Sequence, residues 1–357
     1  MTDRPIDPVC NMPVPPGEST FTAEHDGRVY RFCSRACRDR FAADPGATLA
    51  GVLYDLVILG AGPAGLSAGI FASQAGIDTL LLTRSIGGQA WDSTEVMNYP
   101  GFELITGPDL VKRFRRQAFE SPHLFHRIAD LRALRRTADG FKVTTADGDT
   151  FRSRTVVLAT GMRRRRLGIP GEAELRGKGV SEFHAMPAHR HAGRRVAVVG
   201  GGNSAVQAAL GLAAAGAQVM LVARGYRADD YLKKKAAAEA AITLLLHRSP
   251  VRIEGRDRVE ALVVEPAGGS PEERLPVEAV FVEIGLVPNS DLVRGLADLN
   301  HHGEVIVDGN CRTSVPGLFA AGDVTSTFGK RILIAAADGA KAVLAVRQYL
   351  ATAPAGS

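Results

Sequence analysis

Two stretches of the chain show the same succession of hydrophobic and polar positions. In each, a short run of branched apolar residues leads into a glycine cluster, then into an alanine-rich stretch of helical length, and then into a second apolar run. Short continuous apolar runs are typical of strands that are buried in a parallel sheet. The strands of the first copy are expected at 56–59 and 79–83, and those of the second at 196–199 and 218–222. The pattern predicts an α/β fold with two strand–helix–strand units.

The glycine clusters give both units a binding chemistry. Glycine lets the backbone turn tightly and approach a pyrophosphate, and the helix that follows offers unpaired N–H groups and a partial positive charge. Two such units in one chain predict two nucleotide sites of the Rossmann type. The first is expected at Gly60, Gly62, Pro63, Ala64 and Gly65, and the second at Gly200, Gly202, Asn203, Ser204 and Ala205.

The second strand of each unit bears on the choice of nucleotide. An acidic residue is expected about 20 residues past the glycines, where it would bind a ribose. The first unit has Thr83 at that place, and the second has Arg224 and, three residues later, Arg227. Guanidinium groups match phosphate geometry, so the second unit favours NADPH over NADH. The alternative is that the two arginines belong to a solvated basic loop.

Composition and charge narrow the class of protein. The chain has 357 residues, of which 45% are hydrophobic and 23% charged, so it can bury cores and is not expected to be disordered. A net charge of +5 suits small anionic ligands and is too weak to indicate nucleic acid. The apolar stretch 52–72 contains Asp55 and several glycines, so no membrane span is expected, and the start lacks a signal-peptide pattern. A cytoplasmic protein is the expectation.

Further motifs from residue 54 to 350 carry a family resemblance. They are Gly88-Gln89, the segment Thr94–Phe102 with Asn98, Ala159-Thr160-Gly161, Gly322-Asp323 and Arg331-Ile332. With the two glycine clusters, in this order, the chain resembles the thioredoxin reductase family of flavoproteins. The resemblance implies FAD on the first unit, NADPH on the second and a homodimer. It also implies two three-layer ββα domains, with the second inserted in the first.

The resemblance assigns boundaries and contacts. The FAD-binding domain is expected at 51–162 and 285–357, and the NAD(P)H-binding domain at 163–284. Asp323 is expected to take a ribityl hydroxyl, and the helix that starts near Ile332 is expected to point its positive end at the flavin. The FAD contacts implied beyond the glycine loop are Thr83, Gly88, Gln89, Asn98, Ala159, Thr160, Gly161, Gly322, Asp323, Arg331 and Ile332.

The chain departs from this family at the redox-active dithiol. Family members carry Cys-x-x-Cys and an acid after Gly-Val-Ser, but here Phe183 and Met186 replace the cysteines and Pro187 replaces the acid. Neither phenylalanine nor methionine exchanges disulfides, so thioredoxin reduction by the usual route is not expected. The catalytic residues that pass electrons from the flavin to the acceptor are therefore unknown. His184, Met186, His189 and His191 lie in the same segment and form either a candidate copper site or an exposed histidine-rich loop.

The first 50 residues form a separate, cysteine-bearing α+β module. Three of the four cysteines in the chain, Cys10, Cys33 and Cys37, lie here, and Cys311 lies alone. The motifs Asp7-Pro-Val-Cys10 and Phe32-Cys-Ser-Arg-Ala-Cys37 resemble the YHS domain, a small metal-associated module. Three thiolates suit Zn(II), Cu(I), Ag(I) or Hg(II). His25 is either a fourth ligand or, as the favoured alternative, a surface histidine in a hairpin turn. A domain of about 45 residues rarely folds by burial alone, so a metal is physically expected.

These features favour an NADPH-dependent FAD oxidoreductase without a dithiol. Its acceptor is predicted to be a small molecule, a soft metal ion or a metal-linked partner delivered by the YHS module, or a small electron-transfer protein. Disulfide reduction through Cys33 and Cys37 is an alternative, and ferredoxin or quinone reduction is another. A third alternative, from a different class, is a redox or metal sensor without catalysis.

Overall fold

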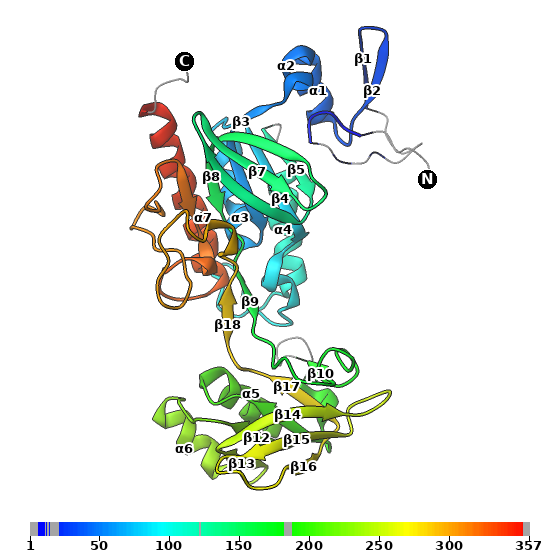
Figure 1. The fold of residues 1–357 in the computed structure, drawn as a ribbon, viewed down its shortest axis with the longest axis vertical. Helices are drawn as coiled ribbons and strands as arrows, with labels where there is room; N and C mark the ends of the chain where they lie inside the picture. The colour runs from blue at the N-terminus through cyan, green and yellow to red at the C-terminus, as the bar shows by residue number, and fades with distance from the viewer. Residues whose placement is uncertain are drawn as a thin grey trace. The chain divides into compact units, whose positions relative to one another are not determined.

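The computed structural model describes residues 6–10, 12, 14, 21–120, 123–181 and 188–352 (Figure 1). The chain divides into two compact units. The first comprises Met1–Met162 and Pro288–Ser357, and the second comprises Arg163–Val287. The chain therefore leaves the first unit and later returns to it. The two connections contain the short strands β9 (Met162–Arg164) and β18 (Leu286–Pro288), which pair with each other.

The first unit is built on a parallel sheet. Its central strand β3 (Leu53–Ala61) lies between β4 (Thr79–Ile86) and β8 (Thr150–Leu158), with β5 (Leu124–Ile128) beyond β4, and β19 (Leu318–Ala320) pairs with β8. The antiparallel strands β6 (Leu131–Thr137) and β7 (Gly140–Thr145) extend from β8. The first predicted unit is confirmed, because β3, α3 (Pro63–Gln74) and β4 follow one another as a parallel crossover.

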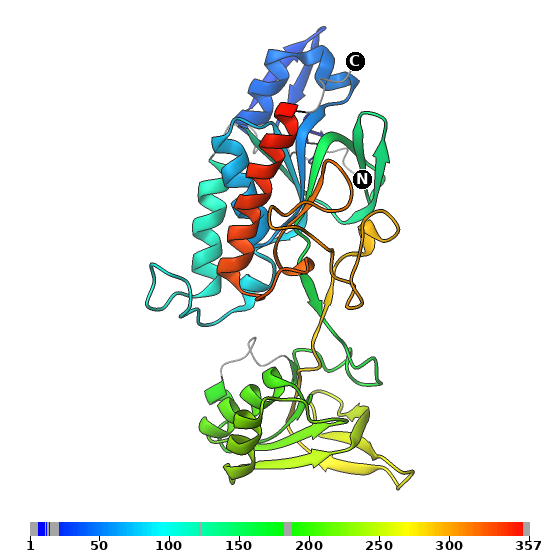
Figure 2. The same ribbon diagram turned by 90° about the vertical axis from the view of Figure 1, so that its left-hand side faces the viewer.

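Alternate residues of β3 serve two different cores. Leu56 and Ile58 pack with α3 and α7 (Ile332–Thr352), and Figure 2 shows α3, α4 (Gly107–Phe119) and α7 along the same face of the sheet. Val57 and Leu59 belong to the core on the other face, which includes residues of β7. The unit thus has helices on one face of the sheet and strands on the other, as the ββα prediction states.

The second unit repeats this arrangement. Its parallel sheet has the order β10 (Val180–Ser181), β17 (Ala279–Val282), β11 (Arg195–Val199), β12 (Gln218–Ala223) and β13 (Ile242–Leu246). Helices α5 (Asn203–Ala214) and α6 (Asp230–Ala238) pack on one face through Val196 and Val198. The antiparallel strands β14 (Arg248–Glu254), β15 (Ala261–Pro266) and β16 (Glu273–Pro276) pack on the other face through Ala197 and Val199. The second predicted unit and the fold class are confirmed.

The cysteine-bearing module belongs to the first unit. It has a hairpin of β1 (Thr22–His25) and β2 (Arg28–Arg31), followed by α1 (Arg35–Ala43) and α2 (Pro45–Ala50). Its buried residues Phe32 and Phe41 lie in the same hydrophobic core as Tyr54, Leu80 and Phe125 of the sheet. Among the helices in the described ranges, none combines the length and hydropathy that crossing a bilayer requires.

Candidate functional site

The glycine loop between β3 and α3, residues 60–65, is shaped to bind a phosphate and is called the FAD cradle below. A Cβ on Gly60 would lie 2.4 Å from the Ala159 carbonyl oxygen, and a Cβ on Gly65 would lie 1.8 Å from the Gly60 carbonyl oxygen. These two glycines let the strand, the helix and the next loop pack closely. Gly62 differs, because nothing lies within 4 Å of its Cβ position. It caps α3 without a side-chain hydrogen bond, so the helix N-terminus is open to a pyrophosphate, and the residues fit that group.

The remaining residues predicted to contact FAD follow the same edge of the sheet. Thr160 and Asn289 are joined by two hydrogen bonds, in which the Thr160 hydroxyl donates to the Asn289 carbonyl at 2.7 Å and the Asn289 amide donates to the Thr160 carbonyl at 2.8 Å. The Gln89 amide donates to the Met162 carbonyl at 2.8 Å. Gly161 has a φ of +64° and open space around its Cβ position. Asn289 is not among the predicted contacts, because it is remote in sequence and carries no motif.

Three other predicted contacts lie near this edge, of which Thr83 and Ala159 are buried and Gly88 is exposed. The Thr83 hydroxyl accepts a hydrogen bond from the Ala61 amide at 3.1 Å and donates to the Ser85 carbonyl at 2.6 Å, so it ties the end of β3 to β4. Gly88 has its Cβ position 3.2 Å from the Gly62 Cα. Ala159, the residue that follows β8, is buried.

The last turn of the predicted FAD site precedes α7. A Cβ on Gly322 would lie 2.9 Å from the Ala64 Cβ, which brings this turn against the start of α3. Burial raises the pKa of Asp323, against the opposing effect of Lys330 and Arg331. Arg331 is exposed, and α7 begins at Ile332 as predicted.

One predicted contact, Asn98, lies on a connecting loop away from the strand ends. Asn98 is exposed on the loop between the 3-10 helix Gly88–Asp92 and α4. With this exception, the predicted FAD residues gather where β3, β4, β8 and β19 end, which is the edge where open α/β sheets bind ligands.

The loop after β11 forms the second cradle. A Cβ on Gly200 would lie 2.1 Å from the Glu283 carbonyl oxygen, whereas the Cβ position of Gly202 is open. Gly202 caps α5 without a side-chain hydrogen bond, and Ala205 is buried behind it. Ser204 is exposed, and the Asn203 side chain bonds to Asp229. The open helix N-terminus fits a second pyrophosphate.

Two arginines lie beside this cradle. The Arg227 backbone amide donates to the Gly201 carbonyl at 2.7 Å, which holds the loop after β12 against the glycine turn. Arg224 and Arg227 are both exposed, and neither has a carboxylate partner within the described ranges. Their guanidinium groups can therefore bind a phosphate.

Most of the segment that replaces the dithiol lies outside the described residues. This holds for Phe183, Met186 and Pro187, and also for His184. His189 is exposed and His191 is buried, and the candidate copper site receives no support from the described part of the segment. Within the described ranges, one group of histidine, cysteine and carboxylate side chains could hold a metal, and it lies in the module.

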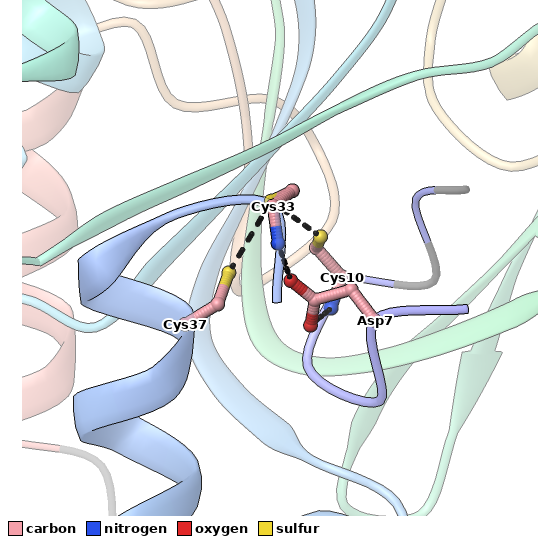
Figure 3. A group of neighbouring side chains, drawn as sticks. All are labelled: Asp7, Cys10, Cys33 and Cys37. Atoms are coloured by element: carbon pink, nitrogen blue, oxygen red, sulfur yellow. Dashed lines mark hydrogen bonds between the residues drawn. The ribbon is translucent and has the colours of Figure 1, made fainter. Parts of the chain in front are cut away.

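That group consists of Asp7, Cys10, Cys33 and Cys37, whose ligand atoms all lie within 4.8 Å of one another (Figure 3). The Cys33 sulfur is 3.5 Å from that of Cys10 and 3.8 Å from that of Cys37. A tetrahedral zinc site with Zn–S bonds of about 2.3 Å has sulfur–sulfur edges of about 3.8 Å. The spacing of the thiols therefore fits a metal ion of that size.

The C-x3-C pair spans the start of helix α1. Cys33 precedes α1, because Ser34 caps the helix and its hydroxyl accepts a hydrogen bond from the Cys37 amide at 3.2 Å. Of the two interpretations of His25, the hairpin position agrees with the structure. His25 is not in the group, since its imidazole pairs with Asp26 at 3.3 Å.

Asp7 belongs to the group although the sequence predicts no role for it. It is fully buried, and its carboxylate accepts hydrogen bonds from the backbone amides of Val9 and Cys33, both at 2.8 Å, and of Cys10 at 3.4 Å. It thereby ties the loop of Cys10 to the loop of Cys33. Burial, and next the Cys33 thiolate, raise the pKa of Asp7 to about 6.

The cysteine thiols of this group differ in pKa. Hydrogen bonds from Cys10 and then Cys37 lower the pKa of Cys33, which marks Cys33 as the first thiolate. The pKa of Cys10 is raised because Cys10 donates to Cys33, interacts with Cys37 and is buried. Since thiolates are the form that binds metals, Cys33 would bind a metal ion first, and the other two thiols would release their protons as they joined it.

The cysteine-bearing module packs against the N-terminal ends of β3 and β4, whereas the FAD cradle lies at the C-terminal end of β3. The Tyr54 hydroxyl, at the start of β3, donates to the Val9 carbonyl at 2.8 Å. Arg40 forms an ion pair with Asp78, just before β4, and its guanidinium lies 5.1 Å from the ring centroids of Tyr54 and Phe125. The cradle begins at Gly60, six residues along β3. At about 3.3 Å per residue, the two sites are about 20 Å apart.

Comparisons with known proteins agree with this architecture. Residues 54–346 match the family described as pyridine nucleotide-disulphide oxidoreductase, and residues 6–47 match the YHS domain. The chain is 35% identical over 307 residues to a thioredoxin reductase of Listeria monocytogenes, covering 84% of this chain and 94% of that protein. It is 36% identical over 302 residues to the F component of alkyl hydroperoxide reductase from Pseudomonas putida, a match that covers 83% of this chain but only 58% of that protein.

Solved structures give the same result. The crystal structure of Lactococcus lactis thioredoxin reductase aligns with a TM-score of 0.72 at 30% identity, covering 84% of this chain and 100% of that one. Thioredoxin reductase from T. acidophilum aligns with a TM-score of 0.69 at 30% identity, covering 84% of this chain and 99% of that one. The chain therefore belongs to the pyridine nucleotide-disulphide oxidoreductase family as a thioredoxin reductase-like, FAD-dependent oxidoreductase with an N-terminal YHS domain.

Proposed function

We propose that this protein is an NADPH-dependent FAD oxidoreductase that reduces an acceptor other than thioredoxin. The observation that carries the proposal is the distribution of cysteine. From residue 54 onward the chain has a single cysteine, Cys311, so this part cannot form the internal disulfide that a dithiol relay needs. Cys311 is buried, and burial and the neighbouring Asp338 raise the pKa of its thiol to about 11, which makes it a poor nucleophile.

The two cradles supply what hydride transfer requires of the chain. The open helix N-termini at Gly62 and Gly202 would bind the pyrophosphates, and Arg224 and Arg227 would select NADPH through its 2′-phosphate. Bound FAD supplies hydride acceptance and onward electron transfer, which need no protein thiol. The residues at the carboxyl edge of the first sheet would orient it, and Asp323 would accept a hydrogen bond from a ribityl hydroxyl.

We propose that the acceptor is a metal ion that the YHS domain supplies or that a partner protein carries, with Cu(II) as the test ion. Three cysteine sulfurs with the Asp7 carboxylate suit Zn(II) or a copper ion. The reaction balances as one NADPH and two Cu(II) giving NADP⁺, two Cu(I) and one proton. Because the cysteine group lies at the opposite edge of the sheet from Gly60, the ion must leave the module, or belong to a second copy in a homodimer, to meet the flavin.

The same placement argues against disulfide reduction through Cys33 and Cys37. These thiols are separated from the FAD cradle by the length of β3, and they are free rather than bonded. Reduction of a ferredoxin or quinone remains compatible with the cradles, and the acceptor experiment distinguishes it from metal reduction.

The experiment measures anaerobic NADPH oxidation by the full-length, FAD-loaded protein with Cu(II), with thioredoxin and with a quinone. Copper is expected to accelerate the reaction and thioredoxin is not. The triple variant C10S/C33S/C37S should lose most of the copper acceleration at low micromolar copper, whereas C311S should keep it. Equal acceleration in both variants would refute delivery by the module. Brisk thioredoxin turnover would refute the function itself.

A further inference from the structure

The second unit contains a hollow that the nucleotide sites do not use. It has a volume of about 510 Å³ and is lined by side chains from the turn before β10, the end of the 3-10 helix Ala188–His191, and the loops before β11, β15 and β17. Such a volume is in the range of small-molecule sites. The charged side chains that line it are Lys178, Arg190, Arg194, Arg258 and Glu278.

The charges of this hollow are unbalanced. Four cations face a single carboxylate, and that carboxylate belongs to Glu278, which pairs with Arg194 at 3.8 Å. Within the described ranges, Lys178, Arg190 and Arg258 have no carboxylate partner. Guanidinium groups with no acid beside them offer several hydrogen-bond donors to an oxyanion.

A buried histidine in the same hollow has unused hydrogen-bonding capacity. His191 is 3% exposed, and both of its ring nitrogens are buried without a hydrogen-bond partner. Its ring packs edge-on against Phe281, with 5.0 Å between the ring centroids, so Phe281 fixes the imidazole without bonding to it. A buried polar group without a partner is unfavourable, so the imidazole lies beside the hollow with its hydrogen-bonding capacity unmet.

The hollow is distinct from the NADPH cradle. Arg194 directly precedes β11 and Gly200 directly follows it, so the two sites lie at opposite ends of a five-residue strand. At about 3.3 Å per residue this strand separates them by more than 15 Å. The residues of the hollow are also separate from Arg224 and Arg227, which follow β12 at the cradle end.

We propose that this hollow is a binding site for a small molecule with a phosphate monoester group. A phosphate monoester carries a charge near −2, which matches the excess of cations better than a monocarboxylate does. The remaining volume would hold the organic part, next to the buried ring of His191. This inference goes beyond the proposed function, because it concerns neither cofactor nor electron acceptor.

The experiment uses the full-length, FAD-loaded protein saturated with NADP⁺, so that both nucleotide sites are filled. Inorganic phosphate is titrated by calorimetry and by the ¹⁵N spectrum of the histidine rings, with acetate as the carboxylate probe. Saturable phosphate binding that shifts the His191 ring signals is expected, with acetate binding at least about tenfold more weakly. Absence of saturable binding, or equal binding of both anions, would overturn the proposal.

Substitution of cations that line the hollow tests whether phosphate binds there. The double variant K178Q/R258Q should weaken phosphate binding by about tenfold or more, because each cation contributes charge-assisted hydrogen bonds. R256Q is the matched control, since Arg256 is an exposed arginine two residues from Arg258 that does not line the hollow. These are surface substitutions, so folding should not be affected. Equal phosphate affinity in K178Q/R258Q and R256Q would show that the anion binds elsewhere.

Discussion

Tyr54→Phe tests whether the YHS domain is packed onto the FAD-binding sheet as part of one core. Tyr54 is fully buried, and its hydroxyl donates to the Val9 carbonyl at 2.8 Å, 45 residues away in sequence. Removing the hydroxyl leaves that carbonyl buried without its donor, which costs about 1–3 kcal/mol. For a unit of this size, about 2 kcal/mol corresponds to a decrease in Tm of about 4–8 °C.

The assay is thermal unfolding, followed by the fluorescence of FAD as it is released from the protein. Tyr231→Phe is the matched control, because Tyr231 is 54% exposed and its hydroxyl has no hydrogen bond among the described residues. Y54F is expected to release FAD at a lower temperature and Y231F at the wild-type temperature. Identical release in all three proteins would refute the shared core.

The other predictions concern the cofactor sites and the lone cysteine. Asp323→Ala should weaken FAD binding by about tenfold to a hundredfold, measured by fluorescence titration, through loss of a charge-assisted hydrogen bond, and Asp298→Ala should not. R224Q/R227Q should raise the KM for NADPH by at least about tenfold while leaving that for NADH unchanged, and an equal effect on both would contradict the assignment. In C10S/C33S/C37S, iodoacetamide should label Cys311 about a hundredfold more slowly at pH 8 than an ordinary thiol, because a pKa near 11 instead of 9.0 lowers the thiolate fraction. That rate should rise about tenfold per pH unit up to about pH 11 and should match a free thiol in urea.

The glycine clusters show what sequence alone can predict. At Gly60 and Gly200 the fold demands close backbone contacts and a positive φ, and at Gly62 and Gly202 it leaves open space. These requirements are local, so the spacing of residues reveals both the crossover and the cradle. The two predicted strand–helix–strand units therefore agree with β3, α3 and β4 and with β11, α5 and β12.

The site features that could not be predicted from the sequence depend mainly on contacts between residues far apart in the chain or on local capping. The role of Asp7 depends on its burial between two loops. No local sequence pattern around Asp7 predicts that burial. The unpartnered nitrogens of His191 likewise depend on packing against Phe281, about 90 residues away. The position of Cys33 before α1 depends on the capping by Ser34, which the C-x3-C spacing does not specify.

The number of NADPH molecules that reduce each FAD tests the central claim most directly. In an anaerobic titration of the metal-free, oxidised, full-length protein, about one NADPH per FAD should bleach the flavin absorbance completely, because a hydride carries two electrons and the flavoprotein part has no disulfide to store two more. An end point of about two NADPH per FAD, lost in C33S/C37S, would reveal a working dithiol and contradict this account.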